Sequence, residues 1–387
     1  MNSIFLSYSG SRTDRAVLFY ALRDHGLTPW RDVESLELGD DTTDVIEQEL
    51  ARATGVILWV NEDVLASTYV ATIELPAIAR ASRQGRLRIV PVFDGLSPTQ
   101  GTERLAAFGL EIGESNGHIV DWTVDADDTA AEIARRYVRS HVKDAWEFGE
   151  DPVLRLVSYD DTADLRAVSV LNLDWRHHFA SGRPEPAAKL RMRSALTAAT
   201  GSIKNAYGGA EITLAVKAHL PLAVAIGNAF AEPTGCTLRM PRDGVEWTTM
   251  RAVGESALLK AEEARKGPVD SRVASVEVSV TRNVEAGVTA HLGAGHRYRH
   301  RLILAPEQGP GRESLNGPAT ANVWGHQIGD ALSMLADRTD VDRIDLFLAT
   351  PVELAVLIGW WANAAGPIGL MNWTGKTGPY EQIWALP

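Results

Sequence analysis

The chain has 387 residues and a mass of 42.0 kDa, a length that allows two or three domains and excludes a single small module. Hydrophobic residues make up 45% and charged residues 23%, which excludes a disordered or collagen-like chain. The longest apolar runs, at 220–226 and 354–361, are far shorter than the roughly 18 to 20 residues of a membrane-spanning helix.

Acidic residues are concentrated in the amino-terminal part. The formal net charge is −12, and residues 1–150 hold 14 Lys+Arg against 25 Asp+Glu, whereas residues 151–387 hold 24 against 25. An acidic chain is poorly suited to wrapping duplex DNA, because that affinity comes from neutralising phosphates. The stretch 176–204 carries six basic residues and one acid, which suits either a small anion or a solvated helix face. Cys236 is the only cysteine and no secretory signal is evident, so we expect a cytoplasmic protein.

Short strand-like runs alternate with helical runs over the first 140 residues. The pattern predicts strands at 3–7, 27–30, 55–60, 88–93 and 118–122, and helices at 12–25, 43–53, 73–82 and 127–142. This alternation is typical of a parallel sheet covered on both faces, whose working loops lie beyond the carboxyl ends of the strands. The polar stretch 143–152 indicates a domain boundary near residue 150.

The remaining residues contain an internal duplication. Leu222–Gly227 matches Leu354–Gly359 at five of six positions, at an offset of 132 residues, and strands are predicted on both sides of each match, at 212–216, 236–240, 344–348 and 368–372. Two copies of a strand–helix–strand unit are therefore expected. Gly227 and Gly359 lie inside the helices, where glycine costs about 1 kcal/mol relative to alanine. Close packing of each helix on its sheet would explain that cost.

The amino-terminal motifs resemble those of the TIR domain. They are Ile4-Phe5-Leu6-Ser7-Tyr8-Ser9, Trp30-Arg31-Asp32, and Leu36-Glu37-Leu38-Gly39-Asp40 before a helix. The resemblance covers about residues 1–140. It implies a flavodoxin-like, five-stranded parallel sheet for a domain at 1–145, cleavage of NAD, and contacts between neighbouring TIR domains through the loop 32–41.

The duplicated part is similar to the SAVED domain, a pair of CARF- or Rossmann-like halves that binds cyclic oligonucleotides. The residues that carry this similarity are Leu348–Pro351, Leu354–Gly359 and Tyr380. The resemblance implies an α/β sensor domain at 155–387, with halves at about 155–265 and 270–387. A TIR domain fused to a SAVED domain is a known effector arrangement of bacterial CBASS antiphage defence.

The TIR resemblance implies a catalytic glutamate. Cleavage of the bond between nicotinamide and ribose passes through an oxocarbenium-like state, which a carboxylate beneath the sugar stabilises. The family's acid follows the third strand in a Ser-x-Trp-Cys-x-x-Glu pattern, and Ser67–Leu75 fills that position, which makes Glu74 the expected catalytic residue.

The match around Glu74 departs from the family pattern. Tyr69 replaces the tryptophan and stands five residues before the acid instead of four. Either Val70 takes the aromatic position or the helix starts one residue late. Glu62 is a competing acid, and a solvent-facing helix carboxylate is the alternative role of Glu74. Apolar neighbours of Glu74 suggest partial burial, which favours catalysis.

Further NAD contacts are implied at the mouth of the first two strands. Backbone amides near Gly10 and Ser11 suit the pyrophosphate, and core packing is the alternative role of Phe5 and Trp30. The full set of expected NAD-binding residues is Phe5, Ser7, Tyr8, Ser9, Trp30, Asp32 and Tyr69.

A cyclic oligoadenylate offers phosphates to basic groups and bases to aromatic rings, and each stacked base contributes about 1 to 3 kcal/mol. Loops beyond the strand ends should supply both. No metal site is expected, because His177 and His178 would point opposite ways on a strand and no cluster of ligands completes a site. Trp360 and Trp361 are expected to pack within a helix. The expected nucleotide-binding residues are Trp175, Arg176, His177, Lys204, Lys217, His219, Arg282, Thr350, Trp373 and Tyr380.

Together the two resemblances imply an NAD⁺ glycohydrolase that releases nicotinamide and ADP-ribose or its cyclised form. NAD⁺ is the substrate, no cofactor is expected, and a cyclic oligoadenylate, with cyclic tri-adenylate the expected one, is the activator. Neighbouring subunits would stack head to tail into a filament, and a nucleotidyltransferase would make the messenger. No DNA or membrane partner is expected. The alternative is a non-catalytic TIR scaffold with a sensing domain; a flavodoxin-like receiver is disfavoured, because Phe5–Tyr8 lacks that fold's clustered aspartates.

Overall fold

A computed structural model describes residues 3–7, 14–30, 42–84, 87–112, 118–120, 126–159, 169–231, 234–250, 258–264, 267–363, 365–374 and 379–387. The strands form three sheets, in the orders β2-β1-β3-β4-β5, β10-β9-β8-β6-β7 and β11-β13-β12-β14-β15-β16. By their internal contacts the residues form two compact units, Met1–Glu150 with Asp164–Leu173, and Asp151–Ala163 with Asp174–Pro387. No helix in these ranges is both long enough and apolar enough to cross a bilayer.

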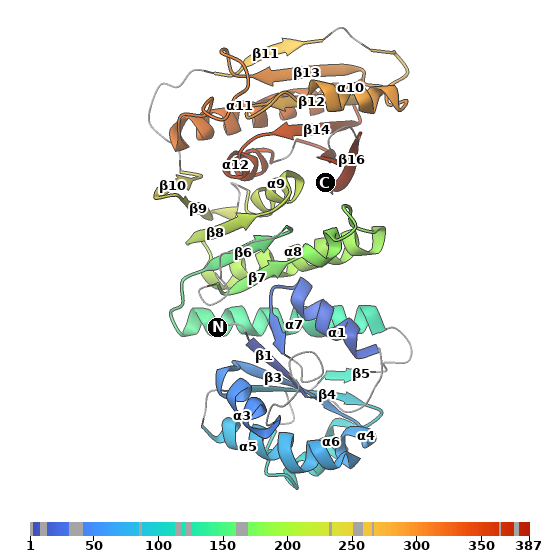
Figure 1. Ribbon diagram of the computed structural model, residues 1–387, viewed down its shortest axis with the longest axis vertical. Helices are drawn as coiled ribbons and strands as arrows, with labels where there is room; N and C mark the ends of the chain where they lie inside the picture. The colour runs from blue at the N-terminus through green and yellow to red at the C-terminus, as the bar shows by residue number, and fades with distance from the viewer. Residues whose placement is uncertain are drawn as a thin grey trace. The chain divides into compact units, whose positions relative to one another are not determined.

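The first unit is a parallel sheet with helices on both faces (Figure 1). The central strand β3 is buried along its whole length, as its continuous apolar run requires. The strand order confirms the flavodoxin-like, five-stranded sheet expected from the sequence. The elements are β1 (Ser3–Ser7), α1 (Asp14–Asp24), β2 (Thr28–Trp30), α3 (Thr42–Arg52), β3 (Gly55–Val60), α4 (Glu62–Ala66), η1 (Val70–Glu74), α5 (Leu75–Arg83), β4 (Arg88–Asp94), α6 (Pro98–Ala106), β5 (His118–Val120) and α7 (Ala126–Glu147).

Two helices of this unit were not expected from the sequence. The helix α4 has five residues, too few to show a helical period, and begins where the Asn61 side chain accepts a hydrogen bond from the Val64 amide. The helix α6 begins with a capping box between Ser97 and Gln100, a signal that the sequence does contain. The outer helices pair as α1 with α7 and α3 with α5.

The second unit contains two sheets, one for each copy of the duplication. In the first sheet β6, β8 and β9 are parallel, and in the second β12, β13, β14 and β15 are parallel. The duplicated segments are the strand–helix–strand units β8-α9-β9 and β14-α12-β15, as predicted. The elements from the linker onward are β6 (Val153–Val157), β7 (Leu171–Asp174), η3 (Arg176–Phe179), α8 (Pro186–Tyr207), β8 (Glu211–Lys217), α9 (Leu220–Ala229), β9 (Thr237–Arg242), β10 (Val245–Thr248), β11 (Lys260–Glu263), β12 (Val273–Ser279), α10 (Glu285–Gly293), β13 (His300–Ala305), α11 (Pro318–Ala336), β14 (Arg343–Ala349), α12 (Val352–Trp361), β15 (Ile368–Trp373) and β16 (Tyr380–Leu386).

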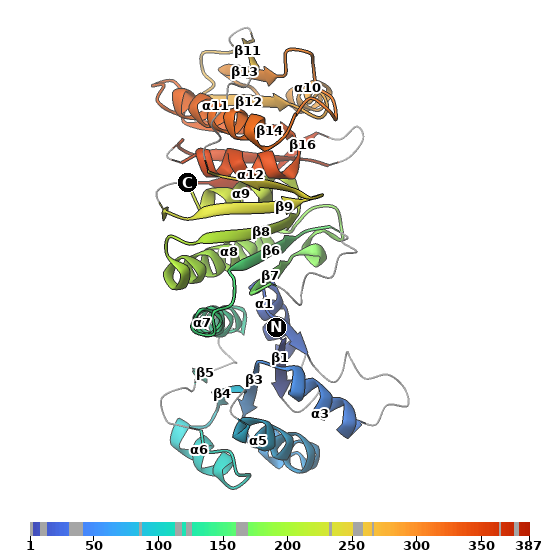
Figure 2. The same ribbon diagram turned by 90° about the vertical axis from the view of Figure 1, so that its left-hand side faces the viewer.

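The helices α9 and α12 lie side by side between these two sheets (Figures 1 and 2). They touch at the duplicated glycines. A Cβ on Gly227 would lie 2.0 Å from the Val356 carbonyl oxygen, and a Cβ on Gly359 would lie 2.0 Å from the Val224 carbonyl oxygen. The expected packing of each glycine on a sheet is therefore wrong. Each glycine lets one helix backbone approach the other. Because of the duplication the contact is reciprocal, with Gly227 facing Val356 and Gly359 facing Val224.

We expect Gly227→Ala and Gly359→Ala each to destabilise the second unit by about 1 to 3 kcal/mol, because the new methyl group has no space between the two backbones. The urea midpoint of unfolding measures the effect. Gly201→Ala is the matched control, because Gly201 also lies in a helix but no atom lies within 4 Å of a Cβ built there. That control should be neutral or stabilising. A Gly227→Ala midpoint equal to that of the natural chain would contradict the close contact.

Candidate functional site

Glu74 is the last residue of the π-helical turn η1, which continues directly into α5. The amide of Leu75 donates to the carbonyl of Val70, five residues earlier. A π turn amounts to one extra residue in an α-helix, and such turns are frequent at functional sites. The residue five positions after a given residue therefore lies close to where the residue four positions later would lie in a regular α-helix. The turn thus accommodates one extra residue between Tyr69 and Glu74.

The Glu74 carboxylate is buried and receives a hydrogen bond from Ser7. Glu74 is 3% exposed and Ser7 is 1% exposed, and the Ser7 hydroxyl donates to Oε2 of Glu74 over 2.5 Å. Ser7 ends β1, so the carboxylate lies at the carboxyl edge of the sheet, where parallel sheets hold their ligands. The burial of Glu74 exceeds the partial burial expected from the sequence.

The competing acid lies in a different environment. The Glu62 side chain is 63% exposed and pairs with Arg104 over 2.5 Å. A solvated, paired carboxylate is a poor partner for a developing cation, because solvent already screens its charge. The geometry therefore favours Glu74 over Glu62 as the acid of this site.

Two aromatic residues expected at the NAD site pack against each other. The rings of Phe5 and Trp30 stack with their centroids 5.0 Å apart, and Phe5 is 1% exposed whereas Trp30 is partly exposed. Phe5 thus contributes to the core and supports the more accessible Trp30. Tyr69 directly precedes the π turn. Tyr8, Ser9, Gly10, Ser11, Asp32 and the loop 32–41 lie outside the described residues.

A further polar cluster at this edge was not expected from the sequence. Asp94, at the end of β4, accepts a hydrogen bond from Trp59 Nε1 over 3.1 Å and a longer one from Asn61 Nδ2 over 3.5 Å. Trp59 and Asn61 lie at the end of β3, which is next to the strand that carries Ser7, and Asp94 ends the following strand, β4. A lone acid at a strand end forms no recognisable pattern, so only the folded sheet brings it to the site.

In the second unit the carboxyl ends of both sheets meet at the start of α12. The strand β9 ends at Arg242, whose guanidinium binds both carboxylate oxygens of Glu353, in the first turn of α12, over 2.9 and 2.8 Å. The amide of Thr281, after β12, donates to the carbonyl of Ala349, at the end of β14. We call this region the strand-end face. It comprises the described residues at and just after the carboxyl ends of β6, β8, β9, β12, β14 and β15.

His219 is the main contribution of the first half to the strand-end face. The Ser158 hydroxyl lies 2.7 Å from His219 Nδ1 and accepts the His219 amide over 2.8 Å. The Ser158 hydroxyl thus contacts both the backbone amide and the imidazole of His219. The ring also stacks on Phe179 at 4.3 Å. The imidazole is therefore fixed in orientation, and burial lowers its pKa.

The second half contributes an aromatic ring, a cation and a hydroxyl. The Arg282 guanidinium lies 4.0 Å above the Trp373 ring, a favourable cation–π geometry. Arg282 is exposed and Trp373 is partly exposed. Thr350 follows β14 directly and is 7% exposed. Three of the residues expected from the sequence thus lie on the strand-end face of this half.

Other expected nucleotide-binding residues have structural partners. Trp175 is fully buried and stacks on Trp384, and Arg176 binds both oxygens of Asp174. The Lys204 ammonium donates to the carbonyl of Ala229, at the last residue of α9 and so at the end opposite to His219. Tyr380 is buried in an aromatic cluster, and burial raises its pKa to about 12. Lys217 ends β8 and is partly exposed.

Comparison with known families matches both units. The profile of the SAVED family, described as the SMODS-associated and fused to various effectors sensor domain, matches residues 196–386, and that of the TIR domain matches residues 4–147. The chain is a TIR domain joined to a SAVED domain. No curated protein matches it significantly in sequence.

Solved structures share the fold of this TIR–SAVED chain. The Acinetobacter baumannii Cap4 SAVED/CARF-domain containing receptor with the cyclic trinucleotide 3′3′3′-cAAA aligns with a TM-score of 0.50 and 14% identity, over 90% of this chain and 86% of that one. The same receptor with 2′3′3′-cAAA aligns with a TM-score of 0.50 and 12% identity, over 89% and 85%. At these identities the likeness shows the fold alone.

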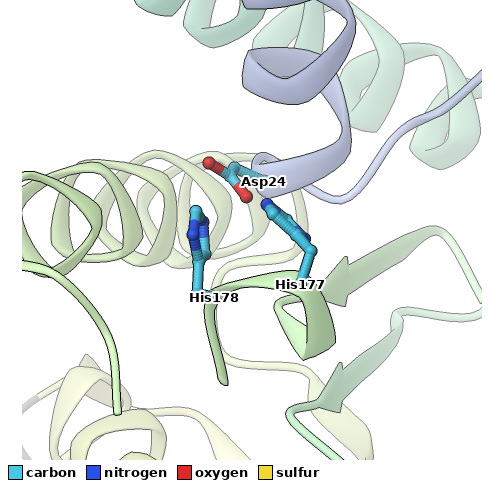
Figure 3. A group of neighbouring side chains, drawn as sticks. All are labelled: Asp24, His177 and His178. Carbon is cyan, nitrogen blue, oxygen red and sulfur yellow. The ribbon is translucent and has the colours of Figure 1, made fainter. Parts of the chain in front are cut away.

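The expected geometry of two histidines of the SAVED unit is wrong. His177 and His178 lie on the short helix η3 and not on a strand, and their rings are 3.9 Å apart instead of pointing opposite ways (Figure 3). A turn of 3₁₀-helix brings consecutive side chains much closer in direction than a strand does.

We expect the chain to lose stability as the pH falls below about 6.5. Burial lowers the pKa of His25, His141, His219 and His291. Each of them binds protons more tightly when unfolded, near pKa 6.5, than when folded, so acid favours unfolding in that range. Urea midpoints measured between pH 8 and 5 test this dependence. His219→Gln should make it shallower. Midpoints independent of pH would contradict it.

Proposed function

We propose that this chain is an NAD⁺ glycohydrolase that a cyclic oligonucleotide switches on. The observation that carries the proposal is the Glu74 carboxylate, buried at the carboxyl edge of a TIR sheet and oriented by Ser7. A carboxylate of fixed orientation suits a reaction whose transition state carries positive charge on the sugar. The attached SAVED domain belongs to a family of sensors fused to effectors, which supports ligand control of that reaction.

In the proposed reaction Glu74 stabilises the ribosyl cation as the bond from C1′ to the nicotinamide nitrogen breaks. Nicotinamide leaves with the bonding electron pair and becomes neutral. Water then attacks C1′ and loses one proton, which gives ADP-ribose; attack by the adenine ring nitrogen instead gives the cyclised product. Ser7 orients the carboxylate by donating its hydroxyl proton to Oε2.

The proposed activator is a cyclic oligoadenylate, with cyclic tri-adenylate as the first choice. Cap4, which shares the fold, was solved with a cyclic trinucleotide. The strand-end face of this chain offers an aromatic ring at Trp373 and cations at Arg242 and Arg282, the two kinds of group that bases and phosphates need.

Self-association is the proposed link between ligand binding and catalysis. Glu74 is only 3% exposed in the single chain, so NAD⁺ cannot reach it without a change at the site. Head-to-tail contacts between subunits, which do not close on themselves, would form a filament and provide that change. In the cytoplasm of an infected cell, depletion of NAD⁺ would then act as antiphage defence, with a nucleotidyltransferase supplying the messenger.

Glu74→Gln should reduce nicotinamide release by at least a hundredfold, because the amide keeps the shape of the side chain but loses its charge. Release is measured on the full chain with NAD⁺ and a panel of cyclic di-, tri- and tetranucleotides. Glu62→Gln is the matched control and should retain activity, since Glu62 lies on the surface and pairs with Arg104.

The scaffold alternative makes the opposite prediction. If the TIR domain only recruits partners, no cyclic nucleotide will produce nicotinamide release from either the natural chain or Glu74→Gln. The hydrogen bond from Ser7 to Glu74 would then be a purely structural contact, and its only measurable effect would be on thermal stability.

Trp373→Ala should weaken binding of the activating nucleotide by roughly tenfold to a hundredfold, the loss expected for one stacked base. Calorimetric titration gives the affinity, and light scattering gives the assembly that accompanies it. Trp146→Ala, an exposed tryptophan of the TIR unit, is the control and should bind normally. Equal affinities for the two variants would remove Trp373 from the proposed ligand site.

A further inference from the structure

Arg242 and Glu353 join the two halves of the SAVED domain in an ion pair, in which Nη1 of Arg242 donates to both carboxylate oxygens of Glu353. Arg242 precedes a tight turn in which Asp243 and Gly244 both have positive φ, 50° and 76°, the geometry of a two-residue hairpin turn. The turn fixes the backbone of Arg242 at the end of β9. The Arg242 side chain is 52% exposed, whereas that of Glu353 is 6% exposed. The cation is therefore accessible on the strand-end face while its partner is buried.

The start of α12 has the chemistry of an anion site. The first amides of a helix have no intrahelical acceptor and form the positive end of the helix dipole. Thr350 lies two residues before this helix, and its buried Oγ1 has no hydrogen-bond partner among the described residues. A buried hydroxyl without a partner is unfavourable. An anionic oxygen of a ligand would satisfy both the amides and this hydroxyl.

The surrounding charges favour an anionic ligand with more than one phosphate. Three cations lie at the carboxyl ends of strands on this face. Lys217 ends β8, Arg242 ends β9, and Arg282 follows β12 of the other sheet. Asp243 lies 3.4 Å from Arg242 but is exposed to solvent, which leaves Glu353 as the buried acid of the pair. A guanidinium pairs with a phosphate in the same two-pronged geometry as with a carboxylate.

We propose that Arg242, Thr350 and the first turn of α12 bind one phosphodiester of the cyclic nucleotide, and that Glu353 holds Arg242 in position until the ligand arrives. This subsite rests on the proposed sensing function and assigns named groups to it. Because the phosphodiester competes with the Glu353 carboxylate for the guanidinium and is repelled by its negative charge, Glu353 lowers the affinity for the ligand. The pair thus sets the concentration at which the sensor responds.

A purely structural pair makes a different prediction. If Arg242 and Glu353 only fasten the two halves together, removing either partner should loosen the face and weaken ligand binding alike. In the proposed subsite, removing Arg242 lowers the affinity for the ligand, whereas removing the charge of Glu353 raises it. The sign of the Glu353 effect therefore separates the two roles.

The test is calorimetric titration of the full chain with 3′,3′,3′-linked cyclic tri-adenylate at several salt concentrations. Glu353→Gln should bind about tenfold more tightly than the natural chain, and Arg242→Gln at least tenfold more weakly and with a shallower salt dependence, because one phosphate contact is lost. Thr350→Val, which keeps the shape but removes the hydroxyl, should bind several-fold more weakly. Arg239→Gln is the matched control, because Arg239 lies on the same strand but pairs with Glu211 and Glu246.

The outcomes distinguish this subsite from the proposed function. If the natural chain binds cyclic tri-adenylate but Glu353→Gln binds it no more tightly, with an unchanged thermal midpoint, the subsite is wrong and the sensing function stands. If Glu353→Gln fails to fold, normal affinity in Thr350→Val and Arg242→Lys overturns the subsite instead. If the natural chain binds no cyclic nucleotide of any ring size, the sensing function fails and the subsite fails with it.

Discussion

The contact between α9 and α12 is the constraint on which the SAVED domain depends. Each duplicated glycine, Gly227 or Gly359, faces a backbone carbonyl of the other helix at a distance that a methyl group cannot share. The two helices therefore approach backbone to backbone, and only a narrow range of orientations of the two halves remains compatible with that approach. In this orientation the end of β9 reaches the start of α12, so Arg242 can bind Glu353 across 111 residues of sequence. The geometry of the strand-end face therefore depends on glycine, which has no Cβ, at positions 227 and 359.

Most of the fold could be predicted from local patterns. The apolar run Gly55–Val60 is the buried central strand, with the predicted bounds, because a strand covered on both faces needs apolar residues at every position. The repeat Leu222–Gly227 and Leu354–Gly359 identified both halves, because a duplicated fold keeps the residues of its tightest contact. The position of Glu74 could be predicted from its motif, but not the π turn, since the extra residue fits several helical registers.

The rest depends on contacts between residues far apart in sequence. His177 and His178 were expected on a strand because nothing in two adjacent histidines marks a 3₁₀ turn. Trp175 stacks on Trp384, and Lys204 donates to the end of α9; no local pattern in the sequence shows either contact. No sequence motif marks Ser158, Phe179, Arg242 or Glu353. Their contacts form only when the fold brings the ends of the strands together.

Both candidate sites hold a carboxylate that already has a partner in the single chain. Glu74 accepts a hydrogen bond from the Ser7 hydroxyl, and Glu353 pairs with the Arg242 cation, so each buried carboxyl group has a hydrogen-bond partner. The charge balance then limits how activation can proceed. The first 150 residues hold 14 basic against 25 acidic groups, so copies of the TIR domain repel one another, most strongly at low salt. In the proposed filament, the nearly neutral SAVED domain and its ligand must therefore supply the free energy that brings TIR domains together, and raising the salt concentration should favour TIR contacts while it weakens the phosphate contacts of the messenger.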